Sequence, residues 1–140
     1  MMAGQNDCVF CKIAQGQLPA HIVYEDAQLM AIMDAFPATQ GHVLIIPKAH
    51  AESIYDLPPE TAAAILPLAQ ELARKIKTAL HPDGLNILQN NGKTAGQVVF
   101  HYHMHLIPRY TDDGVVIKHG RPLTLTKEEL AGIAQRIGAQ

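Results

Sequence analysis

Short apolar runs separated by turn residues characterise the first third of the chain. Residues 21–26 and 29–34 are two β-rich runs with Asp26-Ala27-Gln28 between them, which is the pattern of a β-hairpin. Residues 42–46 are almost continuously apolar and are followed by Pro47, as in a strand that is buried on both faces. We therefore expect a sheet in which residues 42–46 form a central strand.

Residues 59–80 follow a helical period instead. The apolar positions recur every three or four residues and form one stripe along a helix: Ile65, Leu68, Leu72, Ile76 and Leu80. Pro59 suits the first helical turn, and the turn residues at 81–84 end the helix. Residues 8–15 fit a short helix or turn.

Two further strands and another helix complete the pattern. Residues 85–90 form a predicted strand, residues 91–96 a polar glycine loop, and residues 98–108 a long strand. After an irregular stretch, Thr126 and Glu129 have the spacing of a capping box that opens a helix. The predicted fold class is therefore α+β: a five-stranded antiparallel sheet with a long helix and shorter flanking helices.

The length of the chain, 140 residues, matches one domain. We expect residues 1–110 to form its main body. Residues 111–140 should form a C-terminal tail with a helix, as part of the same single domain. Hydrophobic residues make up 48% of the chain, which is enough for a packed core and excludes a disordered protein.

Charge and cysteine content narrow the expected partners and location. Charged residues make up 17% of the chain and the net charge is −2, so the basic surface of a protein that binds nucleic acid or anionic membranes is missing. No apolar run approaches the roughly 20 residues of a membrane span, and the first residues do not resemble a secretory signal. With only Cys8 and Cys11, we expect a cytoplasmic protein that binds neither nucleic acid nor membrane.

Histidine is unusually frequent, with eight in the chain. His101, His103 and His105 alternate with apolar residues, so in a strand they share one face. Three interpretations are compatible with this row: a polar face toward solvent, a catalytic metal site with three histidine ligands, or a histidine nucleophile with histidine helpers. The alternation alone leaves all three open.

Residues 101–107 also form a longer motif. They read histidine-apolar-histidine-apolar-histidine-apolar-apolar, and Asn90-Asn91-Gly92 and Gly96-Gln97 lie just upstream. A further block, residues 41–50, runs from a Gly-His pair through Pro-Lys to another histidine. Together these sequences resemble the histidine triad family, and the resemblance covers about residues 8–109.

The resemblance implies an enzyme that hydrolyses or transfers nucleoside 5′-monophosphates from purine phosphoramidates, adenylated amines or related anhydrides. It implies that His103 is the nucleophile and forms a nucleotidyl-histidine, because neutral imidazole attacks phosphorus well. By the same resemblance, His105 donates hydrogen bonds to the phosphoryl oxygens, and His42 orients its neighbours or relays protons. The alternatives are a nucleotide-binding regulatory or interaction module with little turnover and, for His42, a surface position at a strand start.

The glycine loop takes the phosphate in this scheme. The resemblance implies that backbone amides of Gly96, Gln97 and Val98 cradle the α-phosphate and that Asn90 adds a side-chain donor. Many eukaryotic-type relatives carry serine where Val98 stands. Valine has no hydroxyl to offer the leaving group, so this sequence difference affects the leaving-group preference. The backbone amide of Val98 is still present.

The residues that bind the nucleoside are assigned by the same resemblance. By resemblance, Asp34 binds the two ribose hydroxyls. Phe10 and Ile13, with Phe36, would form an apolar slot for the base. Plain core packing explains Phe10 and Ile13 equally well.

Cys8 and Cys11 form a C-x-x-C pair, which alone is compatible with redox chemistry, metal ligation or free thiols. No strand is predicted before Cys8, which argues against a thioredoxin-like redox pair. Zinc-binding members of the family add two histidines at positions that correspond here to His50 and His101. The resemblance thus implies a closed, structural zinc site, with reduced free thiols as the alternative. It also implies a homodimer.

Overall fold

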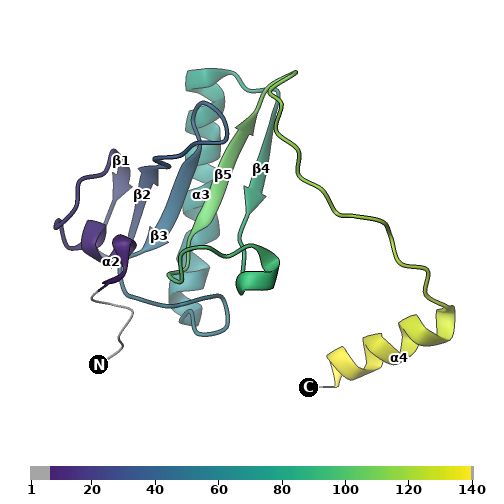
Figure 1. Ribbon diagram of the computed structural model, residues 1–140. Helices are drawn as coiled ribbons and strands as arrows, with labels where there is room; N and C mark the ends of the chain where they lie inside the picture. Colours follow the sequence, from purple (N-terminus) through teal and green to yellow (C-terminus); the bar gives the residue numbers. More distant parts are fainter. Residues whose placement is uncertain (1–6, 140) are drawn as a thin grey trace.

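The computed structural model describes residues 7–139, and its main body is a five-stranded antiparallel sheet (Figure 1). Residues 1–6 and 140 lie outside the described part. In chain order the elements are α2 (Val9–Ala14), β1 (Ile22–Glu25), β2 (Leu29–Met33), β3 (Val43–Pro47), α3 (Pro59–Leu80), β4 (Gly84–Leu88), the 3₁₀ turn η1 (Lys93–Ala95), β5 (Met104–Arg109) and α4 (Lys127–Gly138). The strand order is β1-β2-β3-β5-β4, and every neighbouring pair is antiparallel. The predicted fold class is confirmed.

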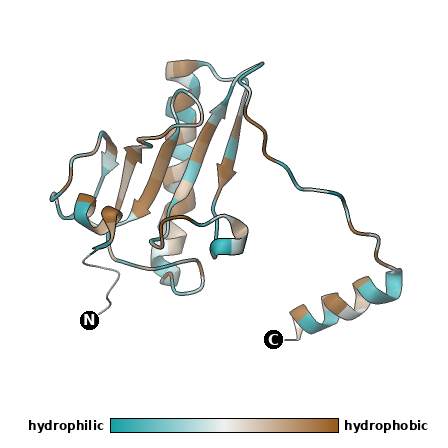
Figure 2. Ribbon diagram, in the orientation of Figure 1, coloured by the Kyte–Doolittle hydropathy of each residue, from teal (hydrophilic) through white to brown (hydrophobic). Residues whose placement is uncertain are grey.

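The central strands are apolar on both faces because a helix covers each face. On β2, Leu29 and Ala31 belong to the core beneath α3, whereas Met30 and Ile32 belong to a second core that includes residues of α2. Strand β3 alternates in the same way. Figure 2 shows hydrophobic residues concentrated on these central strands. The predicted central position of the 42–46 strand is confirmed, since β3 lies between β2 and β5.

Helix α3 buries the predicted apolar stripe against the sheet. Of the predicted stripe, Ile65, Leu68, Leu72 and Ile76 are buried, and Leu80 is partly buried against the same core. The helix begins at Pro59, whose missing amide hydrogen costs nothing in a first turn. It ends at His81, which adopts the left-handed conformation (φ 52°) that often closes a helix.

The triad strand is shorter than the sequence predicted. The expected strand over residues 98–108 begins only at Met104. The preceding residues bond outside the sheet: the Tyr102 amide donates to the Ala51 carbonyl at 2.7 Å. The predicted alternation still holds for packing, because Tyr102, Met104 and Leu106 all contribute to the core beneath α3. The apolar face of this strand was therefore predictable, and the start of the strand was not.

The C-terminal segment is bonded to the main body only near its start, where Thr111 donates to Asp83 and Arg109 pairs with Asp113. Helix α4 has the predicted capping box, with 3.1 Å hydrogen bonds in both directions between Thr126 and Glu129. Residues 111–139 include no buried residue, and Figure 1 shows α4 standing apart from the sheet at the end of an extended segment. Within residues 7–139, no helix combines the length and apolar character needed to cross a membrane.

Candidate functional site

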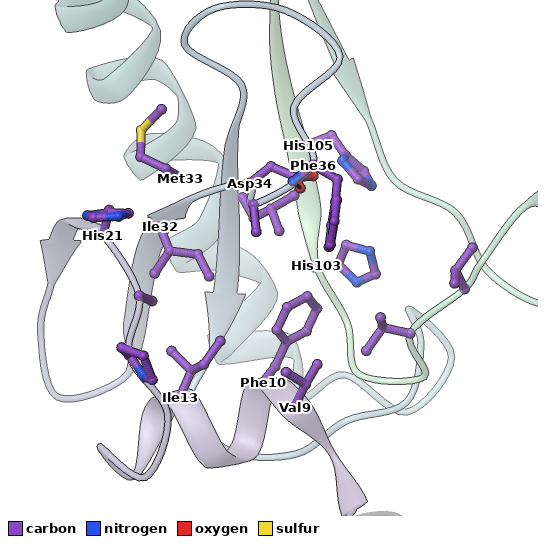
Figure 3. Close-up of a pocket in the computed structure, with 16 residues that line it drawn as sticks. Val9, Phe10, Ile13, His21, Ile32, Met33, Asp34, Phe36, His103 and His105 are labelled. Atoms are coloured by element: carbon purple, nitrogen blue, oxygen red, sulfur yellow. Dashed lines mark hydrogen bonds between the residues drawn. The ribbon is translucent and has the colours of Figure 1, made fainter.

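A cavity of about 670 Å³ opens between α2, the β1–β2 hairpin and the segment that leads into β5. Its wall is mostly carbon: of sixteen lining residues, only His21, Asp34, His103 and His105 carry polar side chains (Figure 3). Four of the predicted substrate contacts also line it: Phe10, Ile13, Phe36 and Val98. The cavity therefore gathers two triad histidines, the predicted ribose ligand and the predicted base slot.

His103 has its tautomer fixed by the main chain. Its Nδ1 lies 2.7 Å from the carbonyl oxygen of His101, and a carbonyl only accepts, so Nδ1 carries the proton. The neutral ring therefore keeps an unprotonated Nε2. The Phe10 ring packs edge-on against it, with ring centroids 5.1 Å apart. His103 is only 9% exposed, so its orientation is held from several sides.

His42 and His105 form a second ordered pair. The Ala38 amide donates to Nδ1 of His42 at 3.0 Å, which leaves the proton of neutral His42 on Nε2. That nitrogen lies 2.9 Å from Nδ1 of His105 and 3.4 Å from a carboxylate oxygen of Asp34. His105 accepts through Nδ1 and carries its own proton on Nε2. His42 is 4% exposed, so the surface alternative for this residue was wrong.

Burial keeps this pair neutral. Desolvation lowers the pKa of His105 to about 4, with positive charge on His103 and His42 acting in the same direction. Desolvation also lowers the pKa of His42, against the opposing attraction of Asp34. Near neutral pH, His105 is therefore an uncharged donor through Nε2–H.

The glycine loop differs from what the sequence predicted. The amides of Gly96 and Gln97, expected to be phosphate donors, donate inside the loop to Lys93 and Gly92, each at 3.0 Å. The loop closes on itself through a 3₁₀ turn, which uses these amides. In the described chain, only the Val98 amide of the three has no intrachain acceptor.

The side chains of the loop brace it. Nε2 of Gln97 donates to the Glu52 carbonyl at 2.7 Å, and its Oε1 accepts from the Gly92 amide at 2.8 Å. Asn90 approaches the Gly96 carbonyl at 3.4 Å, a weak contact that leaves its amide available. Gln97 therefore acts as a brace beneath the loop, and Asn90 and the Val98 amide are the donors that remain.

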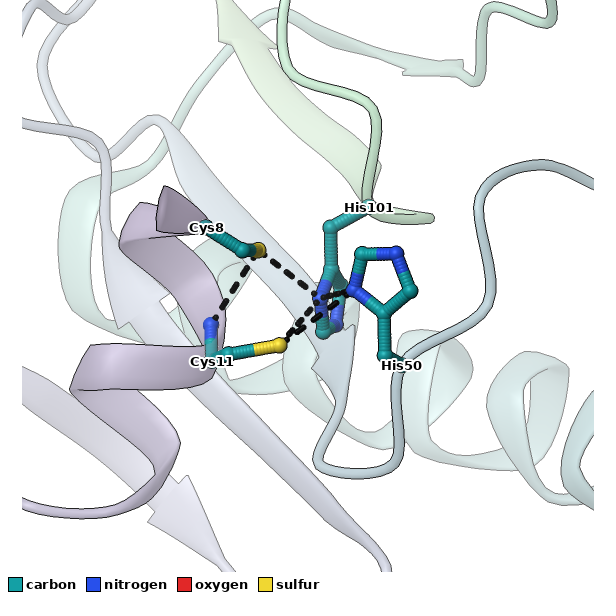
Figure 4. A group of neighbouring side chains, drawn as sticks. All are labelled: Cys8, Cys11, His50 and His101. Carbon is teal, nitrogen blue, oxygen red and sulfur yellow. Dashed lines mark hydrogen bonds between the residues drawn. The ribbon is translucent and has the colours of Figure 1, made fainter. Parts of the chain in front are cut away.

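A separate cluster joins the two cysteines to two histidines (Figure 4). Nδ1 of His101 lies 3.3 Å from Sγ of Cys8 and 3.5 Å from Sγ of Cys11. Nδ1 of His50 lies 3.3 Å from Sγ of Cys11 and 3.2 Å from Nδ1 of His101. Tetrahedral zinc, with bonds of about 2.3 Å to sulfur and 2.0–2.1 Å to nitrogen, places its ligand atoms about 3.3–3.8 Å apart. The four donors fit zinc.

The protonation state of the cluster favours metal as well. Nε2 of His101 donates to the Pro47 carbonyl at 2.7 Å, which leaves Nδ1 free to ligate. Burial lowers the pKa of His101 to about 4, so the ring is neutral. Burial and the neighbouring Cys8 raise the pKa of the Cys11 thiol to about 11, and a bound cation would favour its thiolate.

The cavity contains residues that the sequence did not single out. Ile32 and Leu44 line it from β2 and β3, on the face toward α2. Both residues lie in apolar runs of the sequence, and such runs give no sign of which face borders a cavity. His21 and Met33 line it at the edge of the hairpin, and neither belongs to a motif.

Comparisons with known proteins point to one family. A family model described as "HIT domain" matches residues 15–112. "Protein hit" of Bacillus subtilis is 48% identical over 104 residues, 74% of this chain and 72% of that protein. "Adenosine 5'-monophosphoramidase hnt1" of Schizosaccharomyces pombe is 35% identical over 133 residues, 95% of this chain and 97% of that protein. "Adenylylsulfatase HINT3" of Arabidopsis thaliana is 45% identical over 109 residues, 78% of this chain and 55% of that protein.

Solved structures share the fold. A HIT family protein from Bacillus anthracis superposes with a TM-score of 0.88 at 43% identity, covering 96% of each chain. A zinc-bound histidine triad family protein from Mycobacterium smegmatis superposes with a TM-score of 0.75 at 40% identity, covering 97% of this chain and 99% of that one. With its sequence motif, its sheet and its histidine-lined cavity in agreement, this chain belongs to the histidine triad (HIT) family.

Proposed function

We propose that this protein hydrolyses or transfers nucleoside 5′-monophosphates from purine phosphoramidates, adenylated amines or related anhydrides, through a nucleotidyl-histidine intermediate. The observation that carries the proposal is the 2.7 Å contact between Nδ1 of His103 and the His101 carbonyl, which directs the lone pair of the neutral ring to Nε2 at the wall of the cavity. Two relatives support the substrate class, since their names describe an adenosine monophosphoramidase and an adenylylsulfatase.

The first step is an in-line attack. Nε2 of His103 forms a bond to the α-phosphorus, the bond from phosphorus to the leaving group breaks, and the leaving group takes that electron pair and a proton from solvent. The neutral Nε2–H of His105 donates to a phosphoryl oxygen as negative charge builds there. His42 keeps that proton on the correct nitrogen, because it donates to the opposite side of the His105 ring.

The second step regenerates the free enzyme. Water attacks the same phosphorus, the bond to His103 breaks, and the ring recovers its lone pair while the water proton goes to solvent. Another acceptor in place of water gives transfer. The carbonyl of His101 holds Nδ1–H throughout, so the same nitrogen is regenerated for the next cycle.

Nucleotide binding follows the layout of the cavity. Asp34 binds the ribose hydroxyls, since its side chain is 16% exposed and borders the cavity. The base lies in the apolar slot that includes Phe10 and Ile13. The Val98 amide and the Asn90 side chain donate to the phosphate, whereas the amides of Gly96 and Gln97 are bonded within the loop and would have to share their hydrogens to join them.

We also propose that the cysteine and histidine cluster holds a structural zinc ion. Zinc there would have four protein ligands and no open position, so it would supply rigidity rather than reaction chemistry. His101 would be held by its ring at the metal and by Nε2 at Pro47. Its carbonyl would then present a fixed acceptor to His103.

A homodimer in the cytoplasm completes the proposal. Strand β4 is an edge of the sheet, and its Ile87 and the nearby Leu66 of α3 are exposed apolar residues. Helix α4 leaves Leu130 and Ile137 exposed. A second copy of the chain would cover these surfaces. A reducing compartment would keep both thiols available for metal.

A hydrolysis panel tests the proposed activity. Wild-type protein is incubated with an adenosine 5′-phosphoramidate, a dinucleoside polyphosphate and adenylyl sulfate, and release of AMP is followed by chromatography. We expect turnover of the phosphoramidate, and a loss of several orders of magnitude in His103→Ala. Tight AMP binding without turnover of any substrate would contradict the enzyme and favour a nucleotide-binding regulatory module.

A further inference from the structure

The polar groups of the cavity are unevenly distributed. Asp34, His103 and His105 all have roles in the proposed reaction and gather where the ribose and phosphate bind. Figure 3 shows His21 on the opposite side of the group, with Ile13 and Ile32 between it and His103. In the described lining, His21 is the one polar side chain that the proposed mechanism does not use.

The position of His21 is set by the sheet rather than by a loose loop. Its carbonyl accepts from the Met33 amide at 2.9 Å, just before β1 pairs with β2 at Ile22 and Ile32. The imidazole ring makes no hydrogen bond within the described chain, and the residue is exposed. The backbone is anchored, and the ring nitrogens are free for a ligand.

The order of groups in a nucleotide determines what reaches this ring. With the phosphate at His103 and the ribose at Asp34, the base extends through the apolar slot toward His21. In a purine, the atoms farthest from the glycosidic nitrogen are N1, C6 and the substituent on C6. An apolar slot gains energy from any base, but a single hydrogen-bonding group at its end distinguishes one base edge from another.

We propose that His21 reads the polar edge of the base at the 6-position of a purine, and so determines which nucleotides this protein prefers. The inference rests on the proposed function of the cavity, because it needs the phosphate at His103. A neutral imidazole has one donor and one acceptor nitrogen, so it can bond a 6-amino or a 6-keto group. A purine that lacks a substituent there keeps only the ring nitrogen N1 at that edge and has no exocyclic group for the imidazole to bond.

The test compares ligands that differ only at the 6-position. Dissociation constants for AMP, IMP and purine riboside 5′-monophosphate are measured by calorimetry with wild type, His21→Ala, His21→Phe and His21→Gln. Wild type should bind AMP or IMP about two- to tenfold more tightly than the unsubstituted purine, as one hydrogen bond allows. His21→Ala and His21→Phe should lose that preference, and His21→Gln should retain part of it.

The phenylalanine variant distinguishes hydrogen bonding to the base from packing of the His21 ring beside it. If His21 only fills space, His21→Phe keeps the wild-type preference, and the inference is overturned. Equal affinity of wild type for all three ligands overturns it as well. His119→Ala, a change on the exposed tail, should match wild type throughout. The readout is binding, so absence of turnover in the hydrolysis panel would refute the proposed activity while these affinities still decide the role of His21.

Discussion

His101 connects the two clusters of this protein through a single residue. Its ring nitrogen Nδ1 faces the cysteines at 3.3 and 3.5 Å, and its main-chain carbonyl orients the His103 ring at 2.7 Å. A displacement of His101 therefore moves the hydrogen-bond acceptor of the proposed nucleophile. We therefore propose that the first histidine of the triad is a positioning residue and that its neighbours carry out the chemistry.

Asp34 offers a test of nucleoside binding. Asp34→Ala should weaken nucleoside monophosphate binding by about 1.5–3 kcal/mol, the range for hydrogen bonds to a charged group. A 2′,3′-dideoxy nucleotide should lose a similar amount with wild type and almost nothing further with the variant. Calorimetry on the four combinations gives the coupling directly. Losses that simply add would show that Asp34 does not hold the ribose.

The low pKa of His105 predicts a pH dependence of stability. Its folded pKa of about 4 lies below the ordinary value of 6.5, so between these values the unfolded state binds more protons. The stability that this histidine contributes is present above the ordinary value and is lost as pH falls toward 4. Urea titrations should show wild type losing more free energy of unfolding over that window than His105→Gln. Equal losses would mean that burial does not shift this group.

At the scale of elements, the loop before β3 has no room for a side chain at Gly41, next to His42. Gly41 has φ +93°, and a Cβ there would meet Cδ1 of Leu80 at 2.4 Å and Cγ of Pro108 at 3.2 Å. Leu80 at the end of α3 and Pro108 near the end of β5 therefore both pack closely against this turn. The glycine is needed for its backbone angle and for the absence of a side chain.

Two glycine substitutions separate those effects. Gly16→Ala has a similar φ of +76° with open space around it, and should cost about 1 kcal/mol from the backbone alone. Gly41→Ala should cost about 1–3 kcal/mol more, because neighbouring side chains must move. Denaturant melts of the two variants check the difference. Equal costs would show that the packing at Gly41 yields freely.

At the scale of the whole molecule, zinc should stabilise a fold that already has its own core. Elemental analysis of Cys8→Ser should show the loss of stoichiometric zinc. The variant should melt at a lower temperature but remain folded at room temperature. Its activity should fall less than that of His103→Ala, because the metal would only position His101. Binding should weaken as pH falls through the histidine range, since the ligands must be deprotonated.

The matched control is His119→Ala, which removes a histidine from the tail and should keep full zinc content. Purified wild-type protein with reduced thiols and no bound metal, grown with zinc available, would refute the site.

The sequence predicts most of this fold because its signals are local. The stripe of α3, the buried β3 and the capping box of α4 each follow from residue spacing. The start of β5 does not follow from residue spacing, because the Tyr102 amide donates to the carbonyl of Ala51, which is far away in sequence. Tertiary contacts decide such boundaries.

The candidate site shows the same division. The motif indicates which histidines matter, but their tautomers depend on acceptors and donors that only folding supplies, such as the His101 carbonyl and the Ala38 amide. The amides of Gly96 and Gln97 are used by their own turn, which a glycine-rich pattern does not reveal. His21 reaches the cavity through strand pairing, and no motif marks it.

The central claim, attack by His103 on phosphorus, is tested most directly by the stereochemical course of the reaction. A nucleoside 5′-phosphorothioamidate of known configuration at phosphorus is hydrolysed in heavy-oxygen water, and the configuration of the product is determined. Each in-line displacement inverts phosphorus, so a nucleotidyl-histidine intermediate predicts net retention, whether or not the intermediate accumulates. Net inversion would mean that water attacks the substrate directly, and would contradict the role assigned to His103.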